Sequence, residues 1–300
     1  MGILAVQNLT KVYKSHKVLD AISLTIDTPG IWALVGPNGV GKTTFLNVIT
    51  NILPANSGTV ELMGKSNKDS TVFKEVAFLQ DNTVLFDYLT GYDHLKYISD
   101  VQKMPKDRVK EVAEYVGMEG YLKKTVGNYS LGMKQHLLLA MSLINQPKLL
   151  LLDEPLNGLD PTSAILMRKI LLELADQGTT ILLSSHNLSE IDRVTKQILF
   201  LKDGKLTQVD MHQFEDTYYD ILLSDPERAK RVLVEGGYQV GHENGTRGIR
   251  LHLESDQLDQ VIELIKSEGL QILDIQKEKT GSEKLYKEIF SGAPHEKNLV

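Results

Sequence analysis

The segment covering residues 34–49, LVGPNGVGKTTFLNVI, constrains the fold of this chain more than any other. A short apolar run, IWALVG, leads into three glycines, and helical spacing of apolar residues then continues up to Pro54. This order predicts a buried strand, a glycine-rich loop and a helix in immediate succession. Backbone N–H groups of such a bare loop can surround phosphate oxygens, and the N-terminus of the next helix adds positive dipole.

The loop fits the pattern G-x-x-x-x-G-K-[ST], with a strand before it and a helix after it. The pattern predicts a nucleoside triphosphate site in which Lys42 reaches the β and γ phosphates and the Thr43 hydroxyl binds Mg²⁺. The alternative, a glycine-rich turn with an exposed lysine, does not account for the flanking strand and helix. The candidate nucleotide-binding residues are Gly36, Pro37, Asn38, Gly39, Val40, Gly41, Lys42, Thr43 and Thr44.

Two more apolar runs, KLLLLDEP and TTILLSSH, flank the amphipathic segment SAILMRKILLELADQG. Buried strands alternating with helices predict a parallel α/β sheet. Asp153 and Glu154 leave the first of these strands together, and adjacent carboxylates at a buried strand end are costly without a nearby cation. We therefore expect Asp153 to hold Mg²⁺ and Glu154 to orient and deprotonate an attacking water. A solvated acidic strand end is the simpler alternative.

The chain divides into two expected domains. Residues 1–209 start with alternating strand patterns, contain a mostly helical part at about 88–146, and close with a hairpin at Asp203-Gly204. Residues 210–290 follow the order β-α-β-β-α-β, with a middle turn at Asn244-Gly245, which predicts a small α+β domain of ferredoxin-like type. Residues 291–300 are expected to form a flexible tail.

Composition narrows the functions open to the chain. The formal net charge is -6 and basic residues are spread along the sequence, so nucleic acid is not an expected partner. The absence of cysteine excludes disulfides, thiolate zinc sites and cysteine nucleophiles, and it fits a cytoplasmic location. No stretch reaches the roughly 18 apolar residues of a membrane span, so a membrane role requires a separate partner chain.

These motifs together resemble the ATPase subunit of an ATP-binding cassette (ABC) transporter: the loop resembles Walker A, LLLLDEP resembles Walker B, and NGLDP resembles the D-loop. Gln80 at a strand end resembles the Q-loop glutamine, His186 the switch histidine, and Tyr13 the aromatic residue that stacks on adenine. The resemblance implies an α/β P-loop NTPase with a parallel core sheet, an antiparallel β subdomain and a helical subdomain. It implies ATP and Mg²⁺ as cofactors. The implied catalytic residues are Glu154, His186, Gln80 and Lys42, and the implied metal ligands are Thr43, Gln80 and Asp153.

One motif departs from the family pattern L-S-G-G-x-x-Q. In NYSLGMKQHLLLA, Tyr129 and Leu131 replace the leucine and the first glycine, whereas Ser130, Gly132 and Gln135 remain. The resemblance implies that this signature segment meets the γ-phosphate bound to a second copy, so that two copies enclose two nucleotides. Ser130 and Gly132 still allow a capped helix start with N–H groups aimed at an anion, and Leu131 is expected to alter dimerisation and turnover.

The chain most resembles bacterial ATPase subunits of bacitracin and lantibiotic self-protection exporters. This resemblance lies in the Tyr-Ser-Leu-Gly sequence of the signature segment, the stretch LFDYLTGYDHL and the C-terminal appendage. That resemblance implies a membrane permease as partner and a position at the inner face of the cell membrane. Two alternatives stay open: a soluble ABC-type ATPase, and a nucleotide-dependent regulatory module without transport. A GTPase is disfavoured because SNKDS lacks N-K-x-D spacing, and His242 and His252 form no metal cluster with neighbouring carboxylates.

Overall fold

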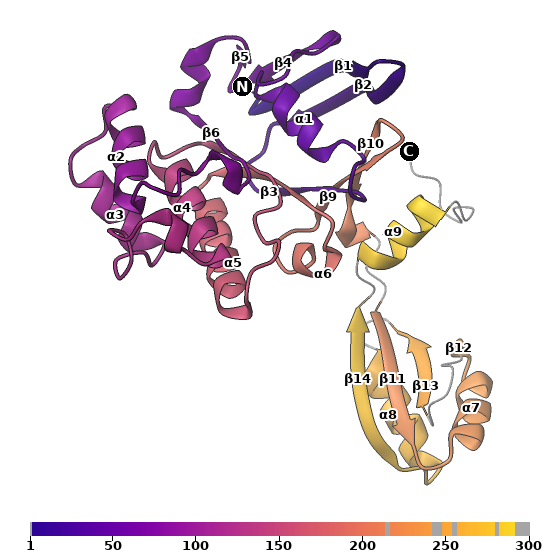
Figure 1. Ribbon diagram of the computed structural model, residues 1–300. Helices are drawn as coiled ribbons and strands as arrows, with labels where there is room; N and C mark the ends of the chain where they lie inside the picture. Colours follow the sequence, from indigo (N-terminus) through magenta and orange to yellow (C-terminus); the bar gives the residue numbers. More distant parts are fainter. Residues whose placement is uncertain (1, 214–216, 242–247, 254–256, 280–281, 292–300) are drawn as a thin grey trace. The chain divides into compact units, whose positions relative to one another are not determined.

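The computed structural model describes residues 2–213, 217–241, 248–253, 257–279 and 282–291 (Figure 1). The chain separates into two compact units, Met1–Asp210 and Met211–Val300. The Asn244-Gly245 turn, His242 and residues 292–300 of the expected tail lie outside the described residues.

A six-stranded sheet forms the centre of the first unit, in the order β10-β9-β3-β8-β7-β6. Neighbouring strands run parallel from β9 to β6, and only β10 is antiparallel, because the Asp203-Gly204 turn joins it directly to β9. Both turn residues have positive φ, 48° and 73°, as a tight hairpin turn requires. The strands are β3 (Ile31–Val35), β6 (Val76–Leu79), β7 (Leu149–Leu152), β8 (Thr180–Ser185), β9 (Gln197–Lys202) and β10 (Lys205–Asp210).

The central strands are buried on both faces. Every residue of β3, β7 and β8 is buried, which agrees with their continuous apolar runs. Parallel strands place their carboxyl ends at one edge of the sheet, so the residues that follow β3, β6, β7 and β8 meet there. The predicted parallel α/β core is confirmed.

A second, antiparallel sheet has the order β2-β1-β4-β5 and shares its hydrophobic core with helix α1 and the parallel sheet. The chain turns between β1 and β2 at Lys14-Ser15, where Lys14 has a φ of 56°. Figure 1 shows this sheet beside α1. Its strands are β1 (Leu4–Tyr13), β2 (His16–Ile26), β4 (Ser57–Leu62) and β5 (Lys65–Ser66).

The expected helical part contains three α-helices, which lie together at one end of the parallel sheet in Figure 1. Thr90 and Asp93 form a capping box at the start of α2, and Gly117, with a φ of 73°, follows the end of α3. The helices of this unit are α1 (Lys42–Ile49), α2 (Gly91–Val101), α3 (Arg108–Tyr115), α4 (Leu131–Leu143), α5 (Pro161–Asp176) and α6 (Leu188–Ile191), with 3₁₀ turns η1 (Ser70–Lys74), η2 (Asn82–Val84) and η3 (Val126–Asn128).

The second unit has the β-α-β-β-α-β order that the sequence predicts, and its antiparallel sheet has the order β12-β13-β11-β14. This is the ferredoxin-like arrangement, with a core formed by alternating residues of β11 and β13 against α7 and α8. Its elements are η4 (Met211–Gln213), β11 (Thr217–Leu223), α7 (Pro226–Glu235), β12 (Val240–Gly241), β13 (Gly248–His252), α8 (Gln257–Ser267), β14 (Ile272–Lys279) and α9 (Ser282–Ser291). Throughout the described residues, every helix is too short or too polar to cross a bilayer.

Candidate functional site

Four candidate residues follow neighbouring parallel strands and reach the same sheet edge. The register aligns Val35 with Ser185 and Leu152 with both Leu183 and Leu79. Continuing this register places Gly36 level with His186, and Asp153 level with Gln80 and Ser184, all at the carboxyl edge. The four candidate residues are Gly36 after β3, Gln80 after β6, Asp153 after β7 and His186 after β8.

The glycine-rich loop has a geometry that larger residues would not allow. A Cβ atom on Gly36 would lie 2.8 Å from the Leu201 carbonyl oxygen, and one on Gly41 would lie 2.7 Å from Cγ1 of Val18. Gly41 also has a φ of 114°, which glycine adopts readily. No side chain caps the start of α1, and its first turn holds no acidic residue. The N–H groups there are thus left to an anion, which fits a bound triphosphate.

Glu154 lies between two basic side chains in front of this loop. Its Oε1 atom is 3.2 Å from the Lys42 ammonium nitrogen, and its Oε2 atom is 3.0 Å from Nδ1 of His186. Lys42 is 6% exposed and also donates a hydrogen bond to the Gly36 carbonyl oxygen at 2.8 Å. The structure therefore brings together a phosphate-binding lysine, a carboxylate and a histidine from three separate segments.

Ser184 is a residue of this site that the sequence analysis missed. Its hydroxyl donates to Oδ1 of Asp153 at 2.5 Å and accepts a hydrogen bond from the Glu154 backbone N–H at 3.0 Å. One buried hydroxyl thereby orients both acidic residues of the β7 end. The available signal was the pair of serines ending an otherwise apolar strand, directly before His186.

A metal ion at this sheet edge would need phosphate oxygens of the nucleotide among its ligands. Among the described residues, no group of three histidine or acidic side chains is arranged to hold a metal ion. Mg²⁺ is usually bound through one or two carboxylates together with substrate phosphates and water. Asp153 and the exposed Thr43 hydroxyl fit a Mg²⁺ ion whose remaining ligands are phosphate oxygens and water.

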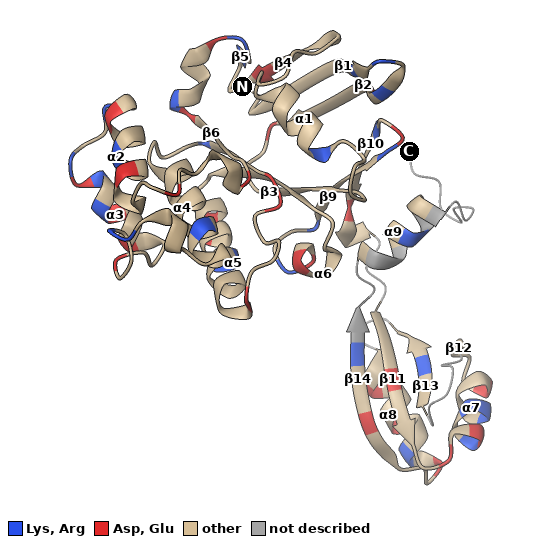
Figure 2. Cartoon of the chain, viewed as in Figure 1, with Lys and Arg blue, Asp and Glu red and all other residues tan. Residues whose placement is uncertain are grey.

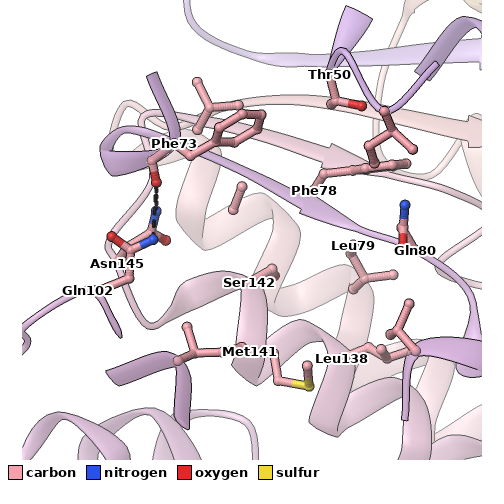
Figure 3. A pocket seen from close by; sticks show the side chains of 15 residues that line it. Thr50, Phe73, Phe78, Leu79, Gln80, Gln102, Leu138, Met141, Ser142 and Asn145 are labelled. Atoms are coloured by element: carbon pink, nitrogen blue, oxygen red, sulfur yellow. Dashed lines mark hydrogen bonds between the residues drawn. The ribbon is translucent and has the colours of Figure 1, made fainter. Parts of the chain in front are cut away.

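Gln80 and Tyr13 lie beside this cluster but make other contacts. Gln80 is one of the residues that line a cavity of about 350 Å³ between β6, α2 and α4 (Figure 3). Tyr13 ends β1 and is 45% exposed. Val18, on the neighbouring strand β2, is the residue that approaches Gly41. The hairpin that carries Tyr13 therefore borders the phosphate loop.

The signature segment, which the sequence predicts to be the second half-site, lies at the start of α4. Ser130 caps α4 by accepting a hydrogen bond from the Met133 N–H at 3.2 Å. A Cβ on Gly132 would lie 2.7 Å from Oγ of Ser163, so glycine allows close packing against the start of α5. Within the described chain, no hydrogen bond or ion pair joins residues 130–135 to residues 36–44. One chain thus carries two half-sites that it does not itself join.

Electrostatics at the signature half-site are set by local hydrogen bonds and burial. Hydrogen bonds from the Ser163 hydroxyl and N–H, and from the Thr162 N–H, lower the pKa of Asp160. Burial lowers the pKa of His136, and its Nδ1 atom lies 3.0 Å from the Tyr121 hydroxyl oxygen. Gln135 is also buried, with the side-chain oxygen lacking a hydrogen-bond partner in the described structure. The carboxylate of Asp160 also lies close to Gly132, since a Cβ atom there would be 3.3 Å from Oδ2 of Asp160.

Leu131 occupies the place of the glycine in the family pattern. It is 41% exposed, and its Cδ2 atom lies 2.8 Å from the position that a Cβ on Gly158 would take. Gly158 has a φ of 71°, so its lack of a side chain serves both its backbone conformation and this contact. Leu131 thus packs on the NGLDP loop without disturbing the Ser130 cap.

Charged residues of both signs are interspersed over the helices and strands of each unit, as Figure 2 shows. Nucleic-acid-binding domains usually gather lysine and arginine on one face or along one helix. The charged residues of the described structure are thus distributed over many elements instead of being gathered on one of them.

Comparison with known proteins shows to which protein family this chain belongs. Residues 19–157 match the family model described as ABC transporter. The bacitracin transport ATP-binding protein BcrA of Enterococcus faecalis is 31% identical over 301 residues, 97% of this chain and 97% of the relative. The lantibiotic transport ATP-binding protein SrtF of Streptococcus pyogenes is 35% identical over 206 residues, covering 68% and 89% of the two chains.

The solved structure of an ATP-binding subunit of an ABC transporter has the same fold, with a TM-score of 0.65 and 25% identity over 71% of this chain and 93% of that one. The range matched by the family model contains the glycine-rich loop and the strand that ends before Asp153. This chain belongs to the ATP-binding subunits of ABC transporters, a family of P-loop NTPases that bind and hydrolyse ATP.

Proposed function

We propose that this chain uses ATP hydrolysis to drive a separate membrane permease, from a position on the cytoplasmic face of the membrane. The observation that carries the proposal is the placement of Glu154 between Lys42 and His186, in front of the phosphate loop. A module that only senses nucleotide has no need of a base at this position. The ATP-binding domain comprises residues 1–209, and residues 210–290 form an appended domain.

In the proposed reaction, Glu154 accepts a proton from a water molecule whose oxygen attacks the γ-phosphorus, while the bond to the bridging β-γ oxygen breaks. Lys42 binds the β and γ phosphates, and His186 positions the γ-phosphate or the water. Thr43, Asp153 and Gln80 would hold Mg²⁺, which neutralises phosphate charge when bound. Ser184 supports this arrangement because it holds the Asp153 carboxylate and the Glu154 backbone at once.

The complete catalytic site is proposed to form between two copies of the chain. Each site would join residues 36–44 of one copy to Ser130, Gly132 and Gln135 of the other, with adenine stacked on Tyr13. Support comes from the two half-sites, which have no hydrogen bond or ion pair between them within the described part of one chain. The capped start of α4 also leaves N–H groups available to an anion.

The proposed contact with the permease lies on residues 81–100. Phe86, Tyr88 and Tyr92 form an aromatic patch there and are 54%, 74% and 41% exposed, so they are not part of the local core. Val84 and Ile98, from the same stretch, line the cavity that also contains Gln80 (Figure 3). Exposed aromatic side chains next to an apolar cavity are typical of a protein-binding surface. A partner seated there would lie directly beside the expected Q-loop residue.

Placing a photo-crosslinking amino acid at Tyr88 in cells that express the whole operon should yield an adduct with an integral membrane protein. The matched control is Tyr115 on α3, which is 38% exposed and outside the aromatic patch, and which should give no such adduct. Mass spectrometry identifies the captured chain. Crosslinks from Tyr88 that reach only water-soluble proteins would contradict the transporter function and favour the soluble ATPase.

The proposed cargo is a peptide antibiotic or a similar amphiphile, expelled from the membrane or the cell. Its support is the similarity over 97% of the chain to a protein named for bacitracin transport, and over 68% to one named for lantibiotic transport. The permease, which this chain does not contain, would hold the substrate path.

Deleting the gene should lower the inhibitory concentration of at least one cyclic or lanthionine-containing peptide antibiotic. A plasmid carrying the parent chain should restore resistance, whereas the Lys42→Ala chain, expressed at the same level, should not. Growth inhibition across a panel of such peptides provides the measurement. If the deletion strain, with the permease expressed, is as susceptible as the parent to every peptide of the panel, peptide antibiotics of this kind are excluded as the cargo.

A further inference from the structure

Lys11 is a buried cation that has no carboxylate partner among the residues that the structure describes. It lies on β1 and is only 9% exposed, and its ammonium group donates a hydrogen bond of 2.6 Å to the carbonyl oxygen of Pro54. None of the ion pairs found among the described residues includes Lys11. A buried charge normally requires a paired charge or strong polar contacts, so the other contact of this ammonium group is informative.

That second contact is the ring of Tyr13. Lys11 and Tyr13 are two residues apart on one strand, so their side chains lie on the same face of the sheet. The ammonium nitrogen is 5.2 Å from the ring centroid, within the range of a cation–π interaction. The ring is nevertheless 45% exposed. Lys11 therefore occupies one face of the ring and leaves ring surface free for a further contact.

Lys11 also connects this ring to the phosphate loop. Pro54 belongs to the connection that follows α1, the helix that starts at Lys42 in the loop. Asn56, in the same connection, donates its N–H to the Thr10 carbonyl oxygen at 2.9 Å and accepts from the Val12 N–H at 2.8 Å. These bonds on either side of Lys11 tie β1 to the far end of α1. The part of β1 next to Tyr13 is thereby bonded to the segment that follows α1.

We propose that Lys11 is a positioning residue for the nucleotide base: its ammonium group holds the Tyr13 ring so that the free face of the ring receives adenine. This inference rests on the proposed contact between Tyr13 and adenine. A ring that is already fixed loses less side-chain freedom when a base stacks on it, so the affinity for the base increases. Lys11 acts on the base-dependent part of the affinity and not on the phosphates.

The test measures dissociation constants for ATP and for tripolyphosphate, which lacks a base, by calorimetry. Lys11→Met should raise the constant for ATP about two- to fivefold, as expected for loss of one cation–π contact, and leave that for tripolyphosphate unchanged. Tyr13→Ala should raise the constant for ATP about 5- to 150-fold. Adding Lys11→Met to Tyr13→Ala should cause no further loss, because the ring through which Lys11 acts is gone.

Lys17→Met is the matched control, because Lys17 is an exposed lysine of the same hairpin that pairs with Asp20, and it should not change ATP affinity. Lys11→Arg, which keeps a cation able to stack on the ring, should retain it. Equal weakening of ATP and tripolyphosphate by Lys11→Met would overturn the inference, since it would place the effect at the phosphates. If Tyr13→Ala weakens ATP binding but Lys11→Met does not, the role of Lys11 is wrong while the contact between Tyr13 and adenine stands. If Tyr13→Ala does not change ATP affinity, the proposed contact between Tyr13 and adenine is itself wrong.

Discussion

Replacing Glu154 by glutamine should lower the rate of ATP hydrolysis about 10²- to 10⁴-fold, the usual contribution of general-base catalysis. Glutamine has nearly the same shape, but its amide cannot accept a proton from water at neutral pH. The dissociation constant for ATP should stay near that of the parent, because Lys42 and the loop N–H groups still bind the phosphates. Single-turnover hydrolysis with the permease present, together with calorimetric ATP binding, separates the two effects.

Glu61→Gln is a suitable control for this change, since Glu61 is an exposed acid on β4 away from the site, and it should hydrolyse ATP at the parent rate. Hydrolysis by Glu154→Gln at the parent rate would exclude Glu154 as the base. The same variant should also accumulate as a dimer in ATP, because the nucleotides that join the copies are not consumed. A strictly monomeric Glu154→Gln protein in light scattering, with ATP and the permease present, would count against the shared site.

Replacing Lys42 by alanine should weaken ATP binding itself, raising the dissociation constant about 10- to 150-fold. The 6% exposed ammonium group lies at the loop and would meet phosphate charge in the ground state and in the transition state alike. The loss in kcat/KM should therefore match the loss in ATP binding. Calorimetry with ATP and with tripolyphosphate provides the measurement, and both ligands should be affected.

The variant also removes the partner of Glu154, so its folding must be checked by thermal unfolding. Lys65→Ala, at an exposed lysine on β5, is the control for loss of one positive charge and should bind ATP normally. An unchanged ATP affinity in a folded Lys42→Ala protein would mean that the backbone alone binds the phosphates. The role assigned to Lys42 would then be wrong.

The sequence alone determined the class of this protein, because its main signals are local. A glycine-rich loop between a strand and a helix, continuous apolar runs such as LLLL at residues 149–152, and the Asp203-Gly204 turn depend on residues adjacent in the chain. The sheets observed in both units agree with the fold class that these local signals predict. The residue type gave no sign of the positive φ of Lys14 in the turn between β1 and β2.

Only the tertiary structure decided which distant side chains meet. The positions of Lys42, Glu154 and His186 around one point depend on the order and register of three parallel strands. Ser184 orienting Asp153, Leu131 packing on Gly158, and Lys11 under the Tyr13 ring are likewise contacts between side chains brought together by packing. Sequence spacing reports the periodicity of a helix or strand, whereas such contacts depend on how separate elements pack, so no local pattern encodes them.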